Sequence, residues 1–419
     1  MTARRMTARR MTARRMTAPH MTGPHMTGPH MIAEDRSTTM TPDTIATRTS
    51  RAAVFHGVGS GLRIEEVRVT GPGPREVLIE VAACGACHSD VHKLQGHGTV
   101  AAPNIFGHEV AGVVHTVGAG VDHVRPGDRV ACTFLVPCGA CAACRSGAED
   151  NCGPFRTMMQ AKGLRYDGTP RYYELDGTPL RASGVGGLVG MVALPAGAVF
   201  PLPGGWPETI PLTDVAVLGC AGLTAYGAVN RAAKVRPGAN VVVLAAGGVG
   251  LCTVALARHA GANTVTVSDV RDESLAAATG FGATGTVHAD EKDFAAKVGE
   301  RAGGAPIDVV FDTIGTPGTI SQALDIVGIG GTVVVSGLAG TGGPGRIENL
   351  NGFVRNKITL VGSYAAVPGE DMPKLLEAVR DGALDPVLLV SARFPFDRAE
   401  AAYDAVASGT VTGRALIEY

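Results

Sequence analysis

The second half of the chain alternates short apolar strands with helices, and this alternation constrains the fold more than any other feature of the sequence. Buried strands are predicted at residues 240–245, 264–268, 284–288, 307–313 and 332–336, with helices at 249–259 and 274–281. Units of this length place their strands parallel in one sheet, because each helix carries the chain back to the starting edge. We therefore predict a doubly wound parallel sheet of the α/β class.

The first half of the chain is β-rich instead. β-branched runs such as 53–55, 77–82 and 110–117 are separated by Gly/Pro turns, and few helical stretches occur before about Pro203. A chain of 419 residues has room for two domains. Its composition is 45% hydrophobic but only 5% aromatic, which predicts a core of Val, Ala, Leu and Ile. A short return segment is expected after Ser363.

The N-terminus is a five-residue repeat. MTARR occurs three times, MTAPH once and MTGPH twice, and the repeat closes at Met31. The repeat has no apolar period with which to bury surface, and it lacks the apolar region of a signal peptide. We expect residues 1–48 to form a disordered, low-complexity tail.

Charge and cysteine content restrict the partners of the chain. Its 37 basic and 38 acidic residues are interspersed and give a formal net charge of −1. No apolar run reaches the roughly 18 residues of a membrane-spanning helix. We therefore expect neither a nucleic-acid nor a membrane partner. Nine cysteines without a secretory signal favour metal ligands over disulfides, and so a cytoplasmic location.

Four cysteines crowd into one short stretch with the spacing C-x2-C-x2-C-x7-C. They are Cys138, Cys141, Cys144 and Cys152. Three thiols at every third position wrap a loop around one point, and the fourth closes a tetrahedron, which suits Zn²⁺ without an open position. The spacing therefore predicts a structural zinc site, against an iron–sulfur cluster or free thiols.

A glycine-rich turn joins the predicted strand 240–245 to the helix that follows it. The turn residues are Gly247, Gly248, Val249 and Gly250. Such a turn lets a pyrophosphate approach the backbone at the helix N-terminus. The other reading is that these glycines only permit close packing of helix on strand. The first position of the usual glycine pattern is Ala245, which is expected to crowd the turn.

The next predicted strand ends at Asp269, 24 residues after Ala245. A carboxylate there can accept hydrogen bonds from the adenosine ribose and would repel a 2′-phosphate. This favours NAD over NADP as the cofactor, although the neighbouring Arg271 is a cation that NADP could use.

A second set of candidate ligands is dispersed along the chain: Cys87, His108 and Cys220. No local spacing unites them, and a cysteine in an apolar run is more often a small core residue. Together with the motifs above, however, they match a family. From Arg51 to Tyr419 the sequence resembles the zinc-containing medium-chain alcohol dehydrogenases.

The resemblance implies a fold and two metals. It places a GroES-like catalytic domain at 49–221 and 364–419, and a Rossmann NAD-binding domain at 222–363. It also implies two zinc ions per chain, a catalytic one held by Cys87, His108 and Cys220 and a structural one on the four-cysteine lobe.

The resemblance assigns roles to individual side chains as well. Ser89 and His92 match a proton relay, and Asp90 and Glu109 match carboxylates beside the catalytic zinc. Phe134 matches an aromatic residue of the substrate pocket. The resemblance also implies cofactor contacts for His88, Thr224 and Arg414, which join the candidate cofactor residues already named: Gly247, Gly248, Val249, Gly250, Asp269 and Arg271.

Two further segments bear on assembly and substrate. Residues 166–173 resemble an insertion of the dimeric animal-type and glutathione-dependent formaldehyde branches, so we expect a homodimer, with a homotetramer as the alternative. Residues 188–194 lack the aromatic and polar residues common in the family, which leaves the shape of the pocket open.

The sequence thus predicts a zinc-dependent alcohol dehydrogenase that exchanges a hydride between a small alcohol or aldehyde and NAD. The alternatives within the family are a thiol-adduct formaldehyde dehydrogenase and a polyol dehydrogenase. A nucleotide-binding regulatory protein without turnover is disfavoured because the ligand trio, Ser89 and His92 are all intact. Two complete zinc sets disfavour a zinc-free quinone reductase.

Overall fold

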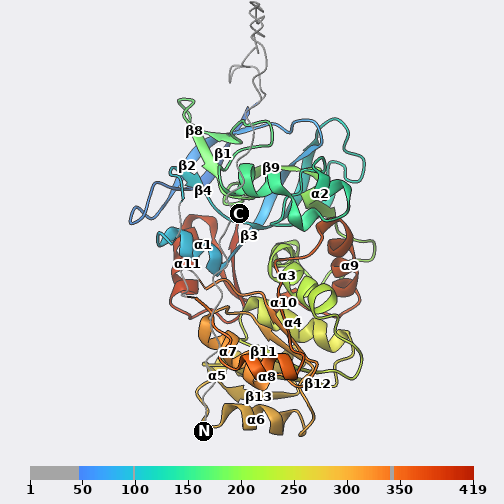
Figure 1. Ribbon diagram of the computed structural model, residues 1–419. Helices are drawn as coiled ribbons and strands as arrows, with labels where there is room; N and C mark the ends of the chain where they lie inside the picture. Colours follow the sequence, from blue (N-terminus) through green and yellow to red (C-terminus); the bar gives the residue numbers. More distant parts are fainter. Residues whose placement is uncertain (1–46, 98–99, 340–343) are drawn as a thin grey trace, which may run out of the picture. The chain divides into compact units, whose positions relative to one another are not determined.

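The computed structural model describes residues 47–97, 100–339 and 344–419. Within these residues the chain forms three β-sheets with helices around them (Figure 1). The repeat and most of the predicted tail lie outside the described residues. The end of the tail was placed two residues too late, because Thr47 and Arg48 already pair with Thr70 and Val69 in the first strand. Backbone pairing extends this strand beyond its apolar residues.

The first sheet is a closed barrel of short strands, and the predicted run 53–55 is the end of β1. In barrel order its strands are β1 (Thr47–Phe55), β2 (Leu62–Thr70), β7 (Tyr172–Tyr173), β8 (Pro179–Ala182) and β4 (Asn104–Ile105). The second sheet has seven strands: β10 (Val199–Pro201), β6 (Arg129–Cys132), β5 (Glu109–Val117), β3 (Glu76–Ala86), β18 (Arg414–Glu418) and β17 (Val390–Pro395), with β9 (Met191–Pro195) paired to β3.

The second sheet joins distant parts of the chain. The strands predicted at 77–82 and 110–117 are confirmed as β3 and β5, and both are longer than predicted. The last strand, β18, lies antiparallel against β3, so the C-terminus ends beside β3 (Figure 1). The C-terminal segment therefore returns to the β-rich part of the protein.

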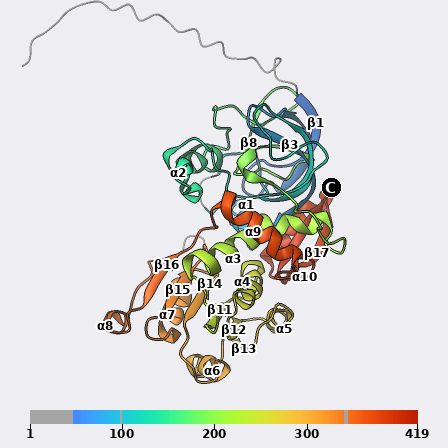
Figure 2. The same ribbon diagram turned by 90° about the vertical axis from the view of Figure 1, so that its right-hand side faces the viewer.

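The third sheet is parallel throughout, as predicted. Its strand order is β13 (Gly285–His288), β12 (Thr264–Asp269), β11 (Asn240–Leu244), β14 (Val309–Asp312), β15 (Thr332–Val335) and β16 (Thr359–Gly362). Figure 2 shows these strands in a row from β16 to β13. The five predicted strands are confirmed within about two residues. The sixth, β16, was not predicted because it is a short, largely exposed edge strand.

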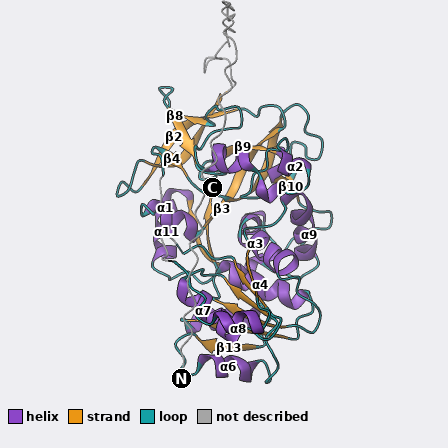
Figure 3. Cartoon of the chain, viewed as in Figure 1, coloured by secondary structure: helices purple, strands orange, loops and turns teal. Residues whose placement is uncertain are grey.

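Helices accompany all three sheets (Figure 3). The α-helices are α1 (His88–Leu94), α2 (Ala142–Arg145), α3 (Ala221–Gly227), α4 (Gly248–His259), α5 (Asp272–Gly280), α6 (Phe294–Arg301), α7 (Pro317–Ile326), α8 (Leu350–Arg355), α9 (Pro368–Arg380), α10 (Pro386–Leu389) and α11 (Ala399–Ala407). The 3-10 helices are η2 (Glu149–Asn151), η4 (Ala196–Ala198), η5 (Leu212–Gly219) and η7 (Phe396–Arg398), and the π-helices are η3 (Phe155–Gln160) and η6 (Ala228–Ala232). The return segment after Ser363 thus carries three helices and two strands, more than the sequence led us to expect.

Both faces of the parallel sheet are buried, which explains the continuous apolar strands that predicted it. Along β11, Val241 and Val243 belong to one apolar cluster, whereas Val242 and Leu244 belong to another on the opposite face. A third cluster fills the barrel and the sheet next to it. The predicted domain limits at 221/222 and 363/364 stay predictions.

Among the described residues no single helix is long and apolar enough to span a membrane. The bent pair η5 and Ala221–Ala232 together has sufficient length and apolarity. Its residues Val215 to Leu218 are fully buried in the protein core, which accounts for their apolar character.

Candidate active site

The three dispersed ligands meet in the fold. Cys87 begins α1, His108 lies in the connection from β4 to β5, and Cys220 lies between η5 and α3. One ligand atom from each of these residues, and one carboxylate oxygen of Glu109, all lie within 4.8 Å of one another. Each of the four residues is at most 9% exposed. The structure therefore brings together the trio that the sequence analysis assigned to a catalytic metal.

Strand pairing explains how residues 21 positions apart converge. Strands β3 and β5 run antiparallel with Gly85 opposite Glu109, so the end of one strand adjoins the beginning of the other. The turn before His108 needs glycine at Gly107, which has φ +88° and whose Cβ would lie 2.7 Å from the Cys84 sulfur. The sequence Gly-His-Glu therefore positions a ligand at the end of β3.

Asp90 fixes the imidazole of His108. Its Oδ2 lies 2.9 Å from Nδ1 of His108, and its Oδ1 accepts a hydrogen bond from Nζ of Lys93 at 3.3 Å. Burial alone would raise the pKa of Asp90, but His108 and Lys93 outweigh burial and hold this pKa below its usual value. With Nδ1 bound to the carboxylate, the other ring nitrogen of His108 is left to a metal.

The charges of Cys87, His108, Cys220 and Glu109 suit a bound cation. A hydrogen bond from Cys220 holds the pKa of the Cys87 thiol well below its usual value, which favours the thiolate that binds metal. Oε1 of Glu109 accepts a hydrogen bond from Nε of Arg414 at 3.0 Å, while Oε2 is buried without a partner in the described structure. Two sulfur donors and an imidazole suit Zn²⁺.

The four-cysteine lobe has the dimensions of a tetrahedral zinc site. The sulfur of Cys144 lies 3.9 Å from that of Cys138 and 3.5 Å from that of Cys141, and the Cys141 and Cys152 sulfurs are 3.9 Å apart. Four thiolates at about 2.3 Å from zinc would be about 3.8 Å apart. All nine cysteines lie among the described residues and are free thiols. The lobe thus matches the predicted structural site.

Backbone N–H groups support these sulfurs. Cys141 and Ala140 donate to the Cys138 sulfur at 3.3 and 3.4 Å, and Cys138 donates to the Cys152 sulfur at 3.3 Å. Such donors compensate part of the excess negative charge of four thiolates on one divalent ion.

The glycines of the turn differ in what surrounds them, which bears on both of the readings that the sequence left open. A Cβ on Gly248 would lie 2.0 Å from a guanidinium nitrogen of Arg414, and one on Gly250 would lie 1.9 Å from the carbonyl oxygen of Ala245. Close packing therefore requires both glycines. Gly247, in contrast, is exposed and has nothing within 4 Å of its missing Cβ. This open position, with Val249 next to it in the first turn of α4, is free for a phosphate.

Ala245 strains this turn. It has φ +73°, in the left-handed region that costs an alanine about 1–2 kcal/mol. We expect Ala245→Gly to stabilise the protein by about 1 kcal/mol and to raise its thermal midpoint by roughly 2 °C, as scanning calorimetry can measure. The adjacent Ala246, which has no such backbone strain, is the matched control, and its change to glycine should lower the midpoint. An equal decrease of the thermal midpoint in both variants would contradict backbone strain at Ala245.

Asp269 lies at the carboxyl end of β12, the edge where parallel sheets bind ligands. Its Oδ2 accepts the N–H of Ala246 at 2.8 Å, and its Oδ1 accepts the N–H of Arg271 at 3.0 Å. The Arg271 side chain turns instead to the carbonyl of Val411 and the hydroxyl of Thr412, at 3.3 and 3.4 Å. The half-buried carboxylate therefore faces the glycine turn, whereas the neighbouring cation is engaged elsewhere.

Arg414 connects the metal ligands to the glycine turn. Besides its hydrogen bond to Glu109, a guanidinium nitrogen lies 4.0 Å from the Cys87 sulfur, and the same group packs against Gly248. The Arg414 side chain is 10% exposed. The predicted cofactor residue is therefore in contact with both halves of the site.

Among the predicted relay, cofactor and pocket residues, Ser89, Thr224 and Phe134 contact the trio, whereas His92 contacts His88. Ser89 Oγ lies 3.4 Å from the Cys87 sulfur, and the His92 ring packs edge-on against His88, with 4.8 Å between ring centroids. Thr224 is buried in α3, and its N–H donates to the carbonyl of Cys220. The Phe134 ring centroid lies 6.0 Å from that of His108.

Two residues of the site were missed by the sequence analysis. The Tyr364 ring packs edge-on against Phe134 with centroids 5.4 Å apart, and its hydroxyl accepts a hydrogen bond from Gln160 at 3.2 Å. No local pattern marks Tyr364. Lys93 lies three residues after Asp90 on α1, a helix that the sequence analysis did not predict, and this i,i+3 spacing places the two side chains on one face.

Residues 188–194, whose lack of aromatic groups raised a question about the pocket, are mostly core. Leu188, Val189 and Val192 to Leu194 are fully buried in the cluster of the barrel and β3. The segment therefore says little about the pocket.

Comparison with known protein families gives two matches. The description "Alcohol dehydrogenase GroES-like domain" covers residues 73–204, and "Zinc-binding dehydrogenase" covers residues 248–381. The first match includes Cys87 and His108 of the trio and the whole four-cysteine lobe. The second begins in the glycine turn.

Curated relatives span most of the chain. The NDMA-dependent alcohol dehydrogenase of Amycolatopsis methanolica is 34% identical over 369 residues, which are 86% of this chain and 96% of the relative. The S-(hydroxymethyl)glutathione dehydrogenase of Paracoccus denitrificans is 30% identical over 370 residues, which are 86% of this chain and 97% of the relative. A solved structure, an alcohol dehydrogenase zinc-binding domain protein from Burkholderia ambifaria, matches with a TM-score of 0.82 and 29% sequence identity. The match covers 89% of this chain and 99% of the Burkholderia chain.

Proposed function

Because the chain belongs to the zinc-containing medium-chain alcohol dehydrogenases, we propose that it transfers a hydride between an alcohol and NAD with a zinc ion on Cys87, His108 and Cys220. The observation that carries this proposal is the buried convergence of the trio beside the glycine turn, with Arg414 touching both. Two thiolates and a neutral imidazole would balance the charge of one divalent ion.

The chemistry divides between the bound groups and the chain. Zinc would supply a Lewis acid for the alcohol oxygen, and NAD would supply the hydride acceptor. Ser89 Oγ, next to the Cys87 sulfur, takes the hydroxyl proton, and His92 receives it further along α1. Asp90 holds Nδ1 of His108 and so fixes the direction of its other nitrogen.

The proposal is tested by an absorbance screen for NADH with zinc measured on the same sample. Primary alcohols, secondary alcohols, polyols and thiol–formaldehyde adducts form the substrate arms. A further arm contains NDMA, because the Amycolatopsis relative is NDMA-dependent by name. We expect zinc-dependent turnover of at least one simple alcohol. A zinc-loaded protein that turns over nothing in any arm would contradict the proposal.

A second candidate function has its own support. Several relatives at 30–33% identity are named S-(hydroxymethyl)glutathione dehydrogenase, and residues 166–173 resemble the insertion of that branch. A preference for the thiol adduct over every simple alcohol would assign the chain to this function. Polyol oxidation is the remaining alternative, and the same screen covers it.

Asp269 is the basis for choosing NAD over NADP. We expect Asp269→Asn to weaken NAD binding about 10- to 100-fold, because a charged acceptor for the ribose hydroxyls is lost. NADP binding should change far less, since the variant also loses the repulsion of its 2′-phosphate. Asparagine keeps the size and one acceptor for the N–H groups of Ala246 and Arg271. Fluorescence titration with each cofactor measures the two affinities. An equal loss of affinity for NAD and NADP would refute the binding of the ribose by Asp269.

We also propose a homodimer built on the edge of the parallel sheet, and a cytoplasmic location in keeping with nine free thiols. Strand β16 leaves one edge unpaired in the described structure, and several exposed apolar side chains lie in or near it: Leu338, Ile347, Leu350, Val354 and Leu360. Two copies of β16 related by a two-fold axis would cover this edge. A tetramer remains the alternative.

Sedimentation equilibrium measures the assembly. We expect the mass of two chains for the wild type and of one chain for Leu360→Lys, because the new charge would lie in the shared edge. Leu388→Lys, at a residue 57% exposed in α10, is the matched control and should stay dimeric. A monomeric wild-type protein would contradict the dimer, and a four-chain mass would support the tetramer.

A further inference from the structure

Helix α1 and the turn after it carry a row of three histidines, and the outermost, His97, has no part in the function proposed above. The His92 ring centroid lies 4.8 Å from that of His88 and 5.4 Å from that of His97. Nδ1 of His92 lies 3.2 Å from Nδ1 of His97. His92 is therefore bound to a second imidazole on its outer side.

A hydrogen bond between two Nδ1 atoms uses one proton, which one ring donates and the other accepts. A neutral imidazole is a donor at one nitrogen and an acceptor at the other, so one ring presents Nδ1–H and the other presents a lone pair. The two rings together can therefore pass a proton along the row. Two fully protonated rings could not keep this contact, because both nitrogens would then be donors.

We propose that His97 is the outer proton acceptor of the alcohol dehydrogenase reaction and takes the proton from His92. The proposal depends on the function proposed above. Nε2 of His92 gains the proton that arrives from the site while its Nδ1–H is lost to Nδ1 of His97. His97 then releases its own Nε2–H to water. No electrons move in these steps, and exchange of tautomers restores both rings.

The surroundings of the row suit this direction of transfer. Burial, and then His88 and His97, lower the pKa of His92, which favours the uncharged ring and the onward transfer of a proton that reaches it. Lys93 is paired with Asp90. From α11, Glu400, Tyr403 and Asp404 face the side of α1 that carries Val91, Leu94 and Gln95, and they line a cavity of about 240 Å³ with them.

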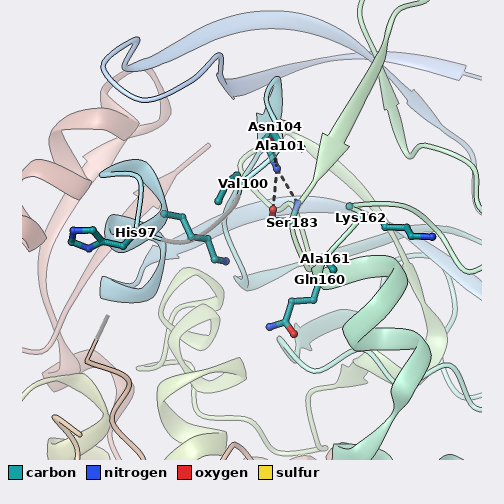
Figure 4. A pocket seen from close by; sticks show the side chains of 10 residues that line it. His97, Val100, Ala101, Asn104, Gln160, Ala161, Lys162 and Ser183 are labelled. Atoms are coloured by element: carbon teal, nitrogen blue, oxygen red, sulfur yellow. Dashed lines mark hydrogen bonds between the residues drawn. The ribbon is translucent and has the colours of Figure 1, made fainter. Parts of the chain in front are cut away.

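His97 is more accessible to water than His92. It is exposed, whereas His92 is half-buried. His97 also borders a cavity of about 210 Å³ whose lining includes the polar side chains of Asn104, Gln160 and Ser183 (Figure 4). In Figure 4 its ring points away from Asn104 and Ser183, so it does not take part in their hydrogen bonds. The ring is free for the contact with His92.

Stopped-flow measurements on the zinc-loaded protein test this role. Hydride transfer is followed by NADH absorbance, and proton release by a pH indicator in weakly buffered solution. We expect His97→Ala and His97→Gln to slow proton release about 3- to 10-fold near neutral pH, less than the 10²- to 10⁴-fold of a direct acid–base group. Added imidazole or alkaline pH should restore the rate. His259→Gln, an exposed histidine at the end of α4, is the control and should match the wild type.

The outcomes separate the two proposals. Turnover by the wild type with unchanged proton release in both His97 variants would overturn the role of His97, as would a loss that neither imidazole nor pH restores. Absence of any wild-type turnover would instead count against the proposed function. In that case the histidine pair is still tested by NMR of ¹⁵N-labelled histidine, where His97→Ala should change the tautomer of His92. An unchanged His92 spectrum would overturn the coupling.

Discussion

Replacing Cys87 with serine should remove one of two zinc ions per chain and lower alcohol turnover by at least about 1,000-fold. The loss of a Lewis acid worth several kcal/mol at the alcohol oxygen corresponds to that factor. Serine is a poor replacement because a neutral hydroxyl lacks the charge of the thiolate that the Cys220 hydrogen bond and the nearby Arg414 favour at Cys87. Zinc is counted by plasma mass spectrometry, and turnover by NADH absorbance.

The matched control for this variant is Cys132→Ala. Cys132 is also fully buried but lies in β6, outside both groups of candidate ligands. It should keep two zinc ions and wild-type turnover. If Cys87→Ser kept both zinc ions and full activity, the trio would not be the catalytic site.

The second large effect concerns stability. We expect Cys144→Ser to lose the other zinc ion and to lower the thermal midpoint by more than about 10 °C. Neither α2 nor η2, the two helical segments of the lobe, buries a residue, so we expect metal–sulfur bonds to contribute much of the stability of this segment. A structural zinc contributes on the order of 10 kcal/mol, as much as the whole folding free energy of many domains.

Calorimetry and limited proteolysis measure this effect together. In Cys144→Ser the first cleavages should fall between residues 138 and 153, and a strong chelator should produce the same pattern in the wild type. Cys132→Ala again serves as the control and should resist cleavage. An unchanged midpoint with two zinc ions retained would refute the structural site. A visible charge-transfer absorption from the purified protein would indicate the iron–sulfur alternative instead.

Much of the fold could be predicted because its signal is local. The strands of the parallel sheet are continuous apolar runs since both faces are covered, and five of six were found. Strand β16 lacks that signal because most of its side chains are exposed. In the barrel, β4 and β7 have two residues each, too few for any alternation to show, and they exist only because neighbouring strands pair with them.

The residues of the candidate site also divide into those with a local sequence signal and those without one. The four-cysteine lobe is encoded by spacing within 15 residues, and the structure brings its four sulfurs together. The trio has no local spacing, because Cys87 and His108 meet through the register of β3 and β5. Only the family resemblance indicated it. Tyr364 and the contact between His92 and His97 could not be predicted, since each depends on side-chain directions that the order of residues does not specify.

The central claim is that Cys87, His108 and Cys220 hold one zinc ion with a free position toward the cofactor. Anomalous diffraction at the zinc edge, from crystals grown with zinc and NAD, tests it most directly. We predict two peaks per chain, one of them about 2.0–2.3 Å from the three ligand atoms with its open side toward Ser89 and the glycine turn. A map with no peak at the trio, or with a fourth protein ligand closing that position, would contradict the claim.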